Sequence, residues 1–540
     1  MDVPPINEPA LNFGFHVVNI LLRTDNQEDD MDKRLKRFGE IVMSSFILIL
    51  LAILIGKYFF SPKTLGKWRS KDNGQHFSEI GQIPETMNYS NQGDAMSIPV
   101  LLYHGIKENP VTKGDVSIEK FQQHMIALKK AGYQTIKLDD FYDFVRGKKK
   151  LPDKSFLLTF DDGSKSSYYP SDHVLRDFNY SAVMYVITGH SLSNKKSSYY
   201  LNETELKEML SSGRWELQSH GKKDHDLITI NPQGEKGRFL SNRMWLKDQN
   251  RFESDEEFRE RIRNDLKAGR DDIARVFGIT PISFAFPAGD YGTENTSFPG
   301  VTDIIVSEVK LVFSLAFYQF RPESAEGFYR NNYPIPDGTS LYKRIKLNNG
   351  LSPSDLINTL NASAVKTIPY KADFSNDRDW ILISGKKAIT SDALTIYGEG
   401  EDRNSIVYLD GTQGWTNYRI DAQIDTVAGN NFSIVSRSLD GLNYLSCNFS
   451  KDSIRLSQTI NDSATVLAQT SSKYSLLSSN SVGMFVDGNK ASCLANGSIL
   501  VVTSQVSSKL SHGSIGFKIW NSLKGEMKLK IQNLYVQEIN

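Results

Sequence analysis

Residues 155–163 read Ser155-Phe156-Leu157-Leu158-Thr159-Phe160-Asp161-Asp162-Gly163, a short apolar run that ends abruptly in two carboxylates and a glycine. The run has the length of a buried strand. Residues just past the carboxyl end of such a strand face the ligand site in barrels and open sheets of βα units. Consecutive side chains point in different directions there, so one carboxylate can bind a metal while its neighbour takes a proton from water. An ordinary Asp-Asp-Gly turn is the alternative interpretation of this stretch taken alone.

A second polar cluster follows another strand-like run. Residues 215–219 lead into His220 and, five positions on, His225. Two imidazoles and one carboxylate suit zinc and other first-row divalent metals. On an α-helix, residues with this spacing point about 140° apart. The two histidines therefore converge only if His220 ends the strand and His225 stands on the following loop. The pair alone is weak, but beside the Asp-Asp-Gly strand end it predicts a metal site.

A third strand-like run, residues 281–286, opens into Pro287, Ala288 and Gly289. Proline and glycine allow the backbone to approach a ligand and to present an amide N–H to it. A tight turn without a chemical role is the alternative for this segment.

Three motifs of this chain resemble, in the same order, those of a known family: Thr-Phe-Asp-Asp-Gly, a Ser-His…His segment and Phe-Ala-Phe-Pro-x-Gly. They are similar to those of the polysaccharide deacetylases of the NodB-homology type, carbohydrate esterase family 4. The run 98–105, which contains Tyr103-His104-Gly105, is also similar to the first barrel strand of many members. The resemblance extends from residue 96 to about residue 350.

The resemblance implies metal-dependent hydrolysis of an N-acetyl group on a sugar. It makes Asp161 the general base, and it assigns a divalent metal to Asp162, His220 and His225. Zinc is the first expectation, with cobalt, nickel or iron as alternatives. The negatively charged oxygen of the tetrahedral intermediate would be stabilised by the metal and by a backbone N–H near Ala288.

Three further residues are predicted to contact the substrate. Pro287 and Tyr291 belong to the third motif, and Trp245 lies in a polar, basic stretch between His225 and Ser254. A plain surface loop is the alternative for the stretch around Trp245.

The chain departs from the family pattern in its histidines and in one arginine. Four residues separate His220 and His225, where the usual number is three, and this longer spacing is similar to that of the exported poly-N-acetylglucosamine deacetylases. The family's later histidine, its general acid, has no counterpart, because no histidine lies between His225 and His512. His104 at the end of the first strand is the predicted substitute, and a hydrogen-bonded structural histidine is the alternative. The arginine expected before the third motif is replaced by Ala285 and Phe286.

The 540 residues suffice for two or three domains, and the hydrophobic content of 39% favours packed cores. Lys+Arg and Asp+Glu are both 63, and this balance argues against nucleic acid as the main partner.

Residues 41–60 are almost entirely apolar, which predicts an uncleaved membrane anchor; a cleaved signal or a buried core helix is the alternative. Basic residues flank the span on both sides, so the expected exterior substrate decides the orientation: residues 1–40 cytoplasmic and the remainder outside. Residues 61–95 are predicted to form a linker.

From residue 96 to 364 strand-like and helix-like runs alternate, which predicts a distorted (β/α) barrel of seven or eight strands. Ser117 and Ser254 are predicted to cap helices, and Gly278 is predicted to end the second of these.

From 365 to 540 short alternating runs between turns predict an all-β sandwich, which weakly resembles concanavalin-like jelly rolls. This domain is expected to bind carbohydrate or to act as a spacer. Its two cysteines, Cys447 and Cys493, form one disulfide or remain two buried thiols.

We therefore expect a membrane-anchored, metal-dependent hydrolase that removes N-acetyl groups from an extracellular polysaccharide containing N-acetylglucosamine. A non-catalytic carbohydrate-binding surface protein built on a degenerate barrel is the main alternative, and the missing late histidine favours it. Hydrolysis of a different amide by the same chemistry is a second alternative.

Overall fold

The computed structural model describes residues 94–539, apart from 293–295, 297, 321–330, 335–340, 391, 399–403, 430, 440, 472–479 and 521–526. The predicted cytoplasmic segment 1–40, the predicted anchor 41–60 and nearly all of the predicted linker 61–95 lie outside the described residues. In the described part of the chain, no helix combines the length and the apolar character needed to cross a membrane.

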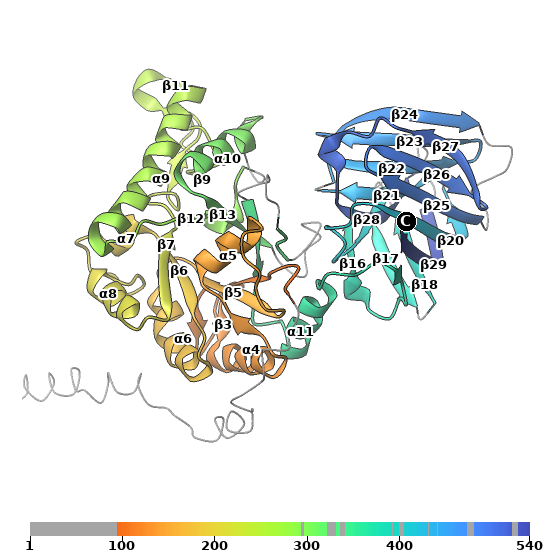
Figure 1. Cartoon of the computed structure of the whole chain (residues 1–540). Coiled ribbons are helices and arrows are strands. Elements are labelled where there is room, and N and C mark those ends of the chain that lie inside the picture. The colour runs from red at the N-terminus through yellow and green to blue at the C-terminus, as the bar shows by residue number, and fades with distance from the viewer. Residues whose placement is uncertain are drawn as a thin grey trace, which may run out of the picture. The chain divides into compact units, whose positions relative to one another are not determined.

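Among the described residues, seven parallel strands close into a barrel, which confirms the predicted architecture (Figure 1). Around the ring the strands are β1 (Val100–Tyr103), β5 (Ser155–Phe160), β6 (Ala182–Val186), β7 (Trp215–Ser219), β12 (Ser283–Ala285), β13 (Leu315–Phe320) and β14 (Leu341–Lys346). The ring closes because its first strand, β1, pairs with the second strand, β5, and also with the last strand, β14. Leu101 of β1 is paired with Leu158 of β5 and with Ile345 of β14. A short strand, β4 (Gln134–Thr135), pairs with Ser155 and Phe156 at the start of the second strand.

Helices follow most of the strands, and α4, α6, α8 and α9 lie on the outside of the barrel (Figure 1). Their amphipathic sequences bury one face each, as in α9, where Phe258, Ile262 and Leu266 are fully buried. The helices are α4 (Ile118–Lys130), α5 (Leu138–Val145), α6 (Lys165–Phe178), α7 (Thr188–Ser191), α8 (Glu203–Ser211), α9 (Asp255–Phe277), α10 (Val301–Val312) and α11 (Pro353–Ala362).

The predicted helix boundaries are confirmed. The Ser117 hydroxyl accepts the Lys120 N–H at the start of α4. Ser254 and Glu257 form a capping box at the start of α9. Gly278 ends that helix in the left-handed conformation, which glycine adopts at low cost.

The parallel arrangement decides where the polar motifs lie. The carboxyl ends of all seven strands meet at one rim of the barrel. His104 follows β1, Asp161 follows β5, His220 follows β7 and Pro287 follows β12. The three motifs and the first strand therefore supply side chains to the same rim, although they are widely separated in the sequence.

An insertion separates β7 from α9. It holds two antiparallel hairpins, β8 (Leu227–Thr229) with β9 (Lys236–Arg238), and β10 (Trp245–Leu246) with β11 (Arg251–Phe252). The polar stretch around Trp245 is thus an ordered insertion with strands of its own.

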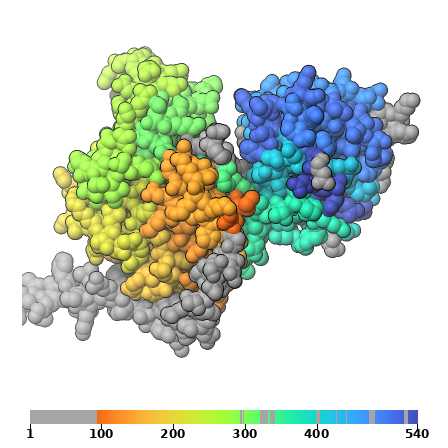
Figure 2. Space-filling view, viewed as in Figure 1, coloured from red at the N-terminus to blue at the C-terminus, as the bar shows by residue number. Residues whose placement is uncertain are grey.

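The C-terminal region folds as two antiparallel sheets around one apolar core, as the alternating runs predicted; the jelly-roll resemblance stays a prediction. In Figure 2 the barrel takes the orange to green colours and the β domain the teal to blue ones. One sheet contains β15 (Tyr370–Lys371), β17 (Lys386–Thr390), β18 (Ala393–Gly398), β20 (Tyr418–Ala428), β25 (Asn480–Asp487), β26 (Lys490–Ala495), β27 (Ser498–Thr503) and β29 (Met527–Glu538). The other contains β16 (Trp380–Ser384), β19 (Asn404–Leu409), β21 (Asn431–Ser438), β22 (Tyr444–Ser450), β23 (Ser453–Ile460), β24 (Ser463–Ser471) and β28 (Ser514–Trp520).

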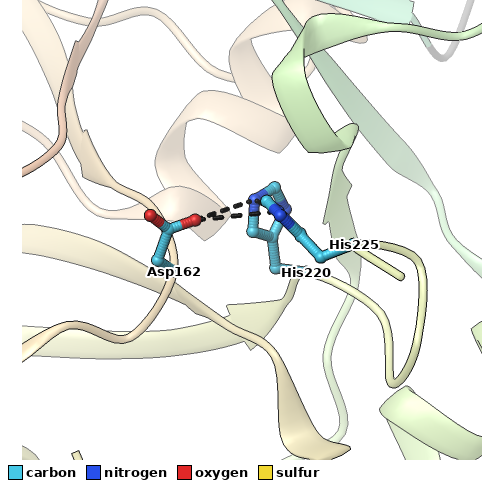
Figure 3. Close-up of side chains that lie close together, drawn as sticks. All are labelled: Asp162, His220 and His225. Carbon is cyan, nitrogen blue, oxygen red and sulfur yellow. Dashed lines mark hydrogen bonds and ion pairs between the residues drawn. The ribbon is translucent and has the colours of Figure 1, made fainter. Parts of the chain in front are cut away.

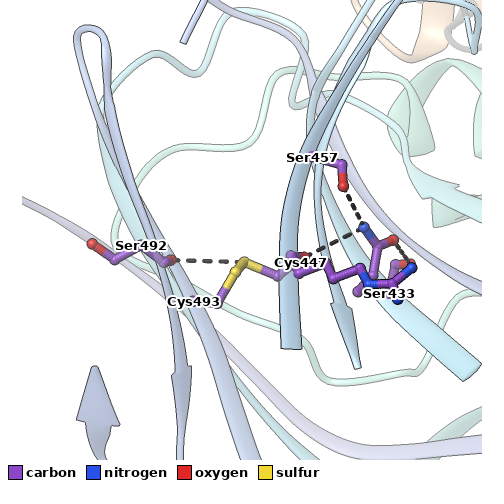
Figure 4. The surroundings of a disulfide bond; sticks show 7 residues. Ser433, Cys447, Ser457, Ser492 and Cys493 are labelled. Atoms are coloured by element: carbon purple, nitrogen blue, oxygen red, sulfur yellow. Dashed lines mark hydrogen bonds between the residues drawn. A yellow bond between two sulfur atoms is a disulfide. The ribbon is translucent and has the colours of Figure 1, made fainter. Parts of the chain in front are cut away.

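Cys447 and Cys493 form a disulfide inside this core, which decides between the two alternatives left open by the sequence (Figure 4). Cys447 lies on β22 of one sheet and Cys493 on β26 of the other. The bond therefore joins the two sheets and closes a loop with a sequence separation of 46 residues.

Replacing both cysteines by alanine should lower the stability of the β domain by about 2–4 kcal/mol, because a closed loop of this length restricts the unfolded chain. Urea unfolding of the oxidised protein and of the double variant measures the difference. A reductant should shift the wild-type transition by a similar amount and leave the Cys447→Ala, Cys493→Ala variant unchanged. A wild-type transition that is insensitive to reductant would contradict the disulfide's stabilising role.

Candidate active site

Asp162, His220 and His225 converge at the rim of the barrel (Figure 3). Their ligand atoms all lie within 4.8 Å of one another. The Nε2 atoms of the two histidines are 3.0 Å apart, and Asp162 Oδ1 is 3.7 Å from His220 Nε2 and 3.6 Å from His225 Nε2. The structure thus brings together the three predicted metal ligands, despite the four residues between the histidines.

His220 is held rigidly at the end of β7. Its backbone N–H donates to the Val186 carbonyl at 2.9 Å. Its ring Nδ1 lies 2.6 Å from the Ala285 carbonyl on β12. Because that carbonyl can only accept, Nδ1 carries the proton and Nε2 keeps its lone pair for a metal.

Asp162 points away from Asp161 because its backbone is left-handed, with φ of 71°. Such a conformation is uncommon for a residue other than glycine, and it often marks a functional site. The Tyr199 hydroxyl donates to Asp162 Oδ2 at 2.9 Å, which leaves Oδ1 facing the histidines. Tyr199 was not predicted, because nothing in its local sequence pattern distinguishes it from neighbouring surface residues.

These three residues fit a divalent metal. Two imidazole nitrogens and one carboxylate oxygen are a donor set that zinc and other first-row metals accept, with coordination positions left for water. Burial, followed by the neighbouring His220, lowers the pKa of His225 to about 4, so this imidazole is neutral at pH 7. A neutral imidazole is the form that binds a metal.

Asp161 is fully buried behind the metal-binding set. Both of its carboxylate oxygens accept hydrogen bonds from Arg344, at 2.6 and 2.7 Å, and the Arg344 side chain is also fully buried. Burial raises the pKa of Asp161, but the charges of Arg344 and His220 outweigh it and hold the pKa below its usual range. The carboxylate is therefore anionic at neutral pH and able to accept a proton.

Arg344 was not predicted. It lies on β14, and its guanidinium also stacks 5.2 Å from the centre of the Tyr185 ring. Its strand pairs with β1 and β13 and lies outside the third motif. The available signal was an arginine inside a strand-length run, Leu341-Tyr342-Lys343-Arg344-Ile345-Lys346, where a buried charge requires a partner.

His104 approaches Asp161 from β1. Its Nε2 is 3.9 Å from Asp161 Oδ2, and its buried Nδ1 has no hydrogen-bond partner among the described residues. Burial and then the charge of Lys346 lower the pKa of His104 to about 4. In contrast, His124 bonds through both ring nitrogens, to the Tyr103 hydroxyl and the Leu351 carbonyl, as a structural histidine does.

The third motif forms one side of a small cavity of about 130 Å³ beside His225. Ala288 adopts a left-handed conformation, with φ of 55°, in the turn that follows Pro287. Arg238 and Asp290 form an ion pair of 2.8 Å at the same cavity. The residues that line the cavity are Asp224, His225, Asp226, Leu227, Arg238, Leu240, Ser241, Pro287, Ala288 and Asp290.

Two predicted substrate contacts do not line that cavity. Tyr291 packs against Phe286 and Tyr318, with ring centres 5.6 and 5.2 Å apart. Trp245 packs against Phe252 in its hairpin, at 5.0 Å. Of the three residues predicted to contact substrate, Pro287 lines this cavity together with His225.

Residues 148–297 match the family described as polysaccharide deacetylase. A poly-beta-1,6-N-acetyl-D-glucosamine N-deacetylase of Escherichia coli K12 is 27% identical over 203 residues, which cover 35% of this chain and 30% of that protein. A protein of the same name from Staphylococcus aureus is 24% identical over 252 residues, 45% of this chain and 79% of that protein. A solved de-N-acetylase structure from Aggregatibacter actinomycetemcomitans aligns with 48% of this chain and 98% of its own, at 22% identity and a TM-score of 0.40.

The alignment thus spans less than a third of the Escherichia coli protein. The range that matches the family contains Asp161 and the metal-binding set, and it ends before Arg344.

Replacing Arg344 by glutamine should lower the stability of the barrel by about 3–5 kcal/mol, because it leaves the buried Asp161 carboxylate without its partner. Denaturant unfolding of the barrel measures the loss. Combining Arg344→Gln with Asp161→Asn should recover part of it, since both charges are then removed. Arg214→Gln is the matched control: its pair with Asp172 is partly exposed and should contribute about 1 kcal/mol or less. Equal losses for the two single variants would contradict the role of the buried pair.

Proposed function

Because this chain contains a polysaccharide deacetylase domain, we propose that it is a metal-dependent hydrolase that removes N-acetyl groups from an amino-sugar polysaccharide. One observation carries the proposal: a buried, anionic Asp161 lies 3.9 Å from His220 Nε2, at the edge of a set of three metal-binding side chains. A base beside a metal site is what hydrolysis of an unactivated amide requires. The names of the Escherichia coli and Staphylococcus aureus relatives support poly-N-acetylglucosamine as the substrate class.

The proposed roles follow from the positions of the residues. A divalent metal held by Asp162, His220 and His225 would polarise the acetamide carbonyl and bring the pKa of a bound water from about 15.7 towards about 7. Asp161 takes the proton from the attacking water, and Arg344 keeps this carboxylate charged and in place. The backbone at Ala288, in its left-handed turn beside the cavity, is the proposed donor to the negative oxygen.

His104 is the proposed acid for the departing amine. With its pKa near 4 the imidazole is neutral at pH 7, so it can give its proton to the nitrogen only if another group replaces that proton. Asp161 holds the proton taken from water, and its Oδ2 lies 3.9 Å from His104 Nε2. Passing the proton from Asp161 to His104 balances the reaction: one water and one amide give acetate and the protonated amine.

The rest of the chain is proposed to bring this site to its substrate. Residues 41–60 would anchor the chain in the cell membrane, with the barrel and the β domain outside, as the apolar run and the expected substrate suggest. The β domain is proposed to bind carbohydrate or to act as a spacer. Pro287 is the proposed substrate contact at the cavity, while Tyr291 and Trp245 stay predictions from the sequence.

A non-catalytic carbohydrate-binding protein was favoured by the missing late histidine. His104 now offers an imidazole within 3.9 Å of Asp161, which weakens the argument for that alternative. The buried charge pair of Asp161 and Arg344 also favours an enzyme, since binding alone does not require an anionic base.

Acetate release from N-acetylglucosamine oligomers tests the proposal with the full chain. Release should require zinc or cobalt, stop on addition of a chelator, and fall by about 10²–10⁴-fold in Asp161→Asn, because the base is lost. Asp172→Asn is the matched control, since that carboxylate pairs with Arg214 away from the site. If the wild-type protein releases no acetate but retains acetylated polymers, it is a binding protein and the proposal is wrong.

Replacing His104 by glutamine should lower kcat by about 10²–10⁴-fold with little change in KM, because the variant still binds substrate but lacks the acid. Zinc binding should be preserved, since His104 is outside the metal-binding set. His124→Gln controls for the loss of a buried histidine and should affect stability more than kcat. Similar kcat values for His104→Gln and the wild type would make His104 a structural residue.

A further inference from the structure

The loop from Gly221 to Asp224 decides where the second histidine lies. His220 is fixed at the end of β7, whereas His225 stands beyond this loop and its side chain is 31% exposed. With four residues between the two histidines, their Nε2 atoms lie 3.0 Å apart only if the loop turns back sharply. Whatever holds the loop therefore determines how well His225 can bind a metal.

The side chain of Asp265, on α9, binds the backbone of this loop. Its carboxylate accepts the Lys222 N–H at 2.9 Å and the Lys223 N–H at 3.0 Å. Both amides belong to consecutive residues between the two histidines, and Asp265 is only 7% exposed. A buried carboxylate needs such partners, and the two amides fix its position as much as it fixes theirs.

Gly269, one turn further along α9, allows the loop to touch the helix. A Cβ at this position would lie 3.0 Å from the Gly221 carbonyl carbon and 3.1 Å from Ser219 Oγ. Glycine inside a helix costs about 0.5–1 kcal/mol relative to alanine, so close contact is a physical reason for its presence. From the other side, the Thr188 N–H donates to the Gly221 carbonyl at 3.0 Å.

We propose that Asp265 and Gly269 of α9 act as positioning residues that place His225 for metal binding. The inference rests on the proposed metal site and adds to it a helix that contributes none of the three metal-binding side chains. It also accounts for the four-residue spacing: the additional residue forms a turn that α9 supports through two backbone amides.

Zinc affinity of the full chain, measured by competition with a chromogenic chelator, tests this directly. Asp265→Asn keeps the size of the side chain, but it places an amide donor opposite one of the two backbone N–H groups. Its zinc affinity should fall by about 10–100-fold, the range found for residues that orient metal ligands. Asp272→Asn is the matched control on the same helix, because Asp272 accepts from the Lys222 side chain at 2.9 Å and not from the loop backbone. Its zinc affinity should remain within about threefold of wild type, since partly exposed pairs contribute little.

Gly269→Ala provides a second variant if Asp265→Asn folds poorly. The added methyl group meets backbone atoms of Gly221, so the loop must move and zinc affinity should again fall. Circular dichroism of the zinc-free variants separates this effect from unfolding. If folded Asp265→Asn or Gly269→Ala binds zinc as tightly as the wild type, the inference is wrong. That result would not affect the proposed deacetylase function. Failure of the wild-type protein to release acetate overturns the proposed function, while reduced zinc affinity of the variants would still uphold the role of α9.

Discussion

The ion pair between Asp161 and Arg344 is the interaction on which the barrel and its site both depend. Two fully buried charges are stable only when each satisfies the other, and here both carboxylate oxygens accept from one guanidinium. The pair joins β5 to β14, two strands that both pair with β1. The same contact keeps the carboxylate anionic, so one pair of side chains joins two strands of the barrel and also holds the charge that the proposed base requires.

Adjacent carboxylates acquire different roles through the backbone that carries them. Asp161 directly follows β5, and its buried side chain binds Arg344. Asp162 enters the left-handed region, and its side chain turns towards His220 and His225. Such a conformation costs of order 1–3 kcal/mol, and the surrounding structure must supply that energy. The glycine that follows adopts positive φ as well, which lets the chain leave the strand at this sharp angle.

Much of the fold and of the site could be predicted from local sequence. Short apolar runs ending in Asp161, His220 and Pro287 located strand ends, and parallel strands bring such ends together. The interactions that join distant segments could not be predicted in this way. Arg344 lies 183 residues from Asp161, and its strand shows no pattern that identifies its partner. The disulfide likewise depended on which sheet each cysteine joins. Tyr291 and Trp245 stay predictions from the sequence, and in the structure each packs against a neighbouring aromatic ring.

The closure of the barrel by β14 has a consequence for the newly made chain. The ribosome delivers Asp161 long before the strand that neutralises it, and at roughly 5–20 residues per second the interval of 183 residues lasts roughly 10–40 s. Over that time the nascent barrel has an open edge at β1 and an unpaired carboxylate in its interior. Its pairing pattern is dominated by contacts between distant segments, which slows folding. The last strand of the barrel therefore both completes the ring, by pairing with β1, and supplies the partner of the Asp161 carboxylate.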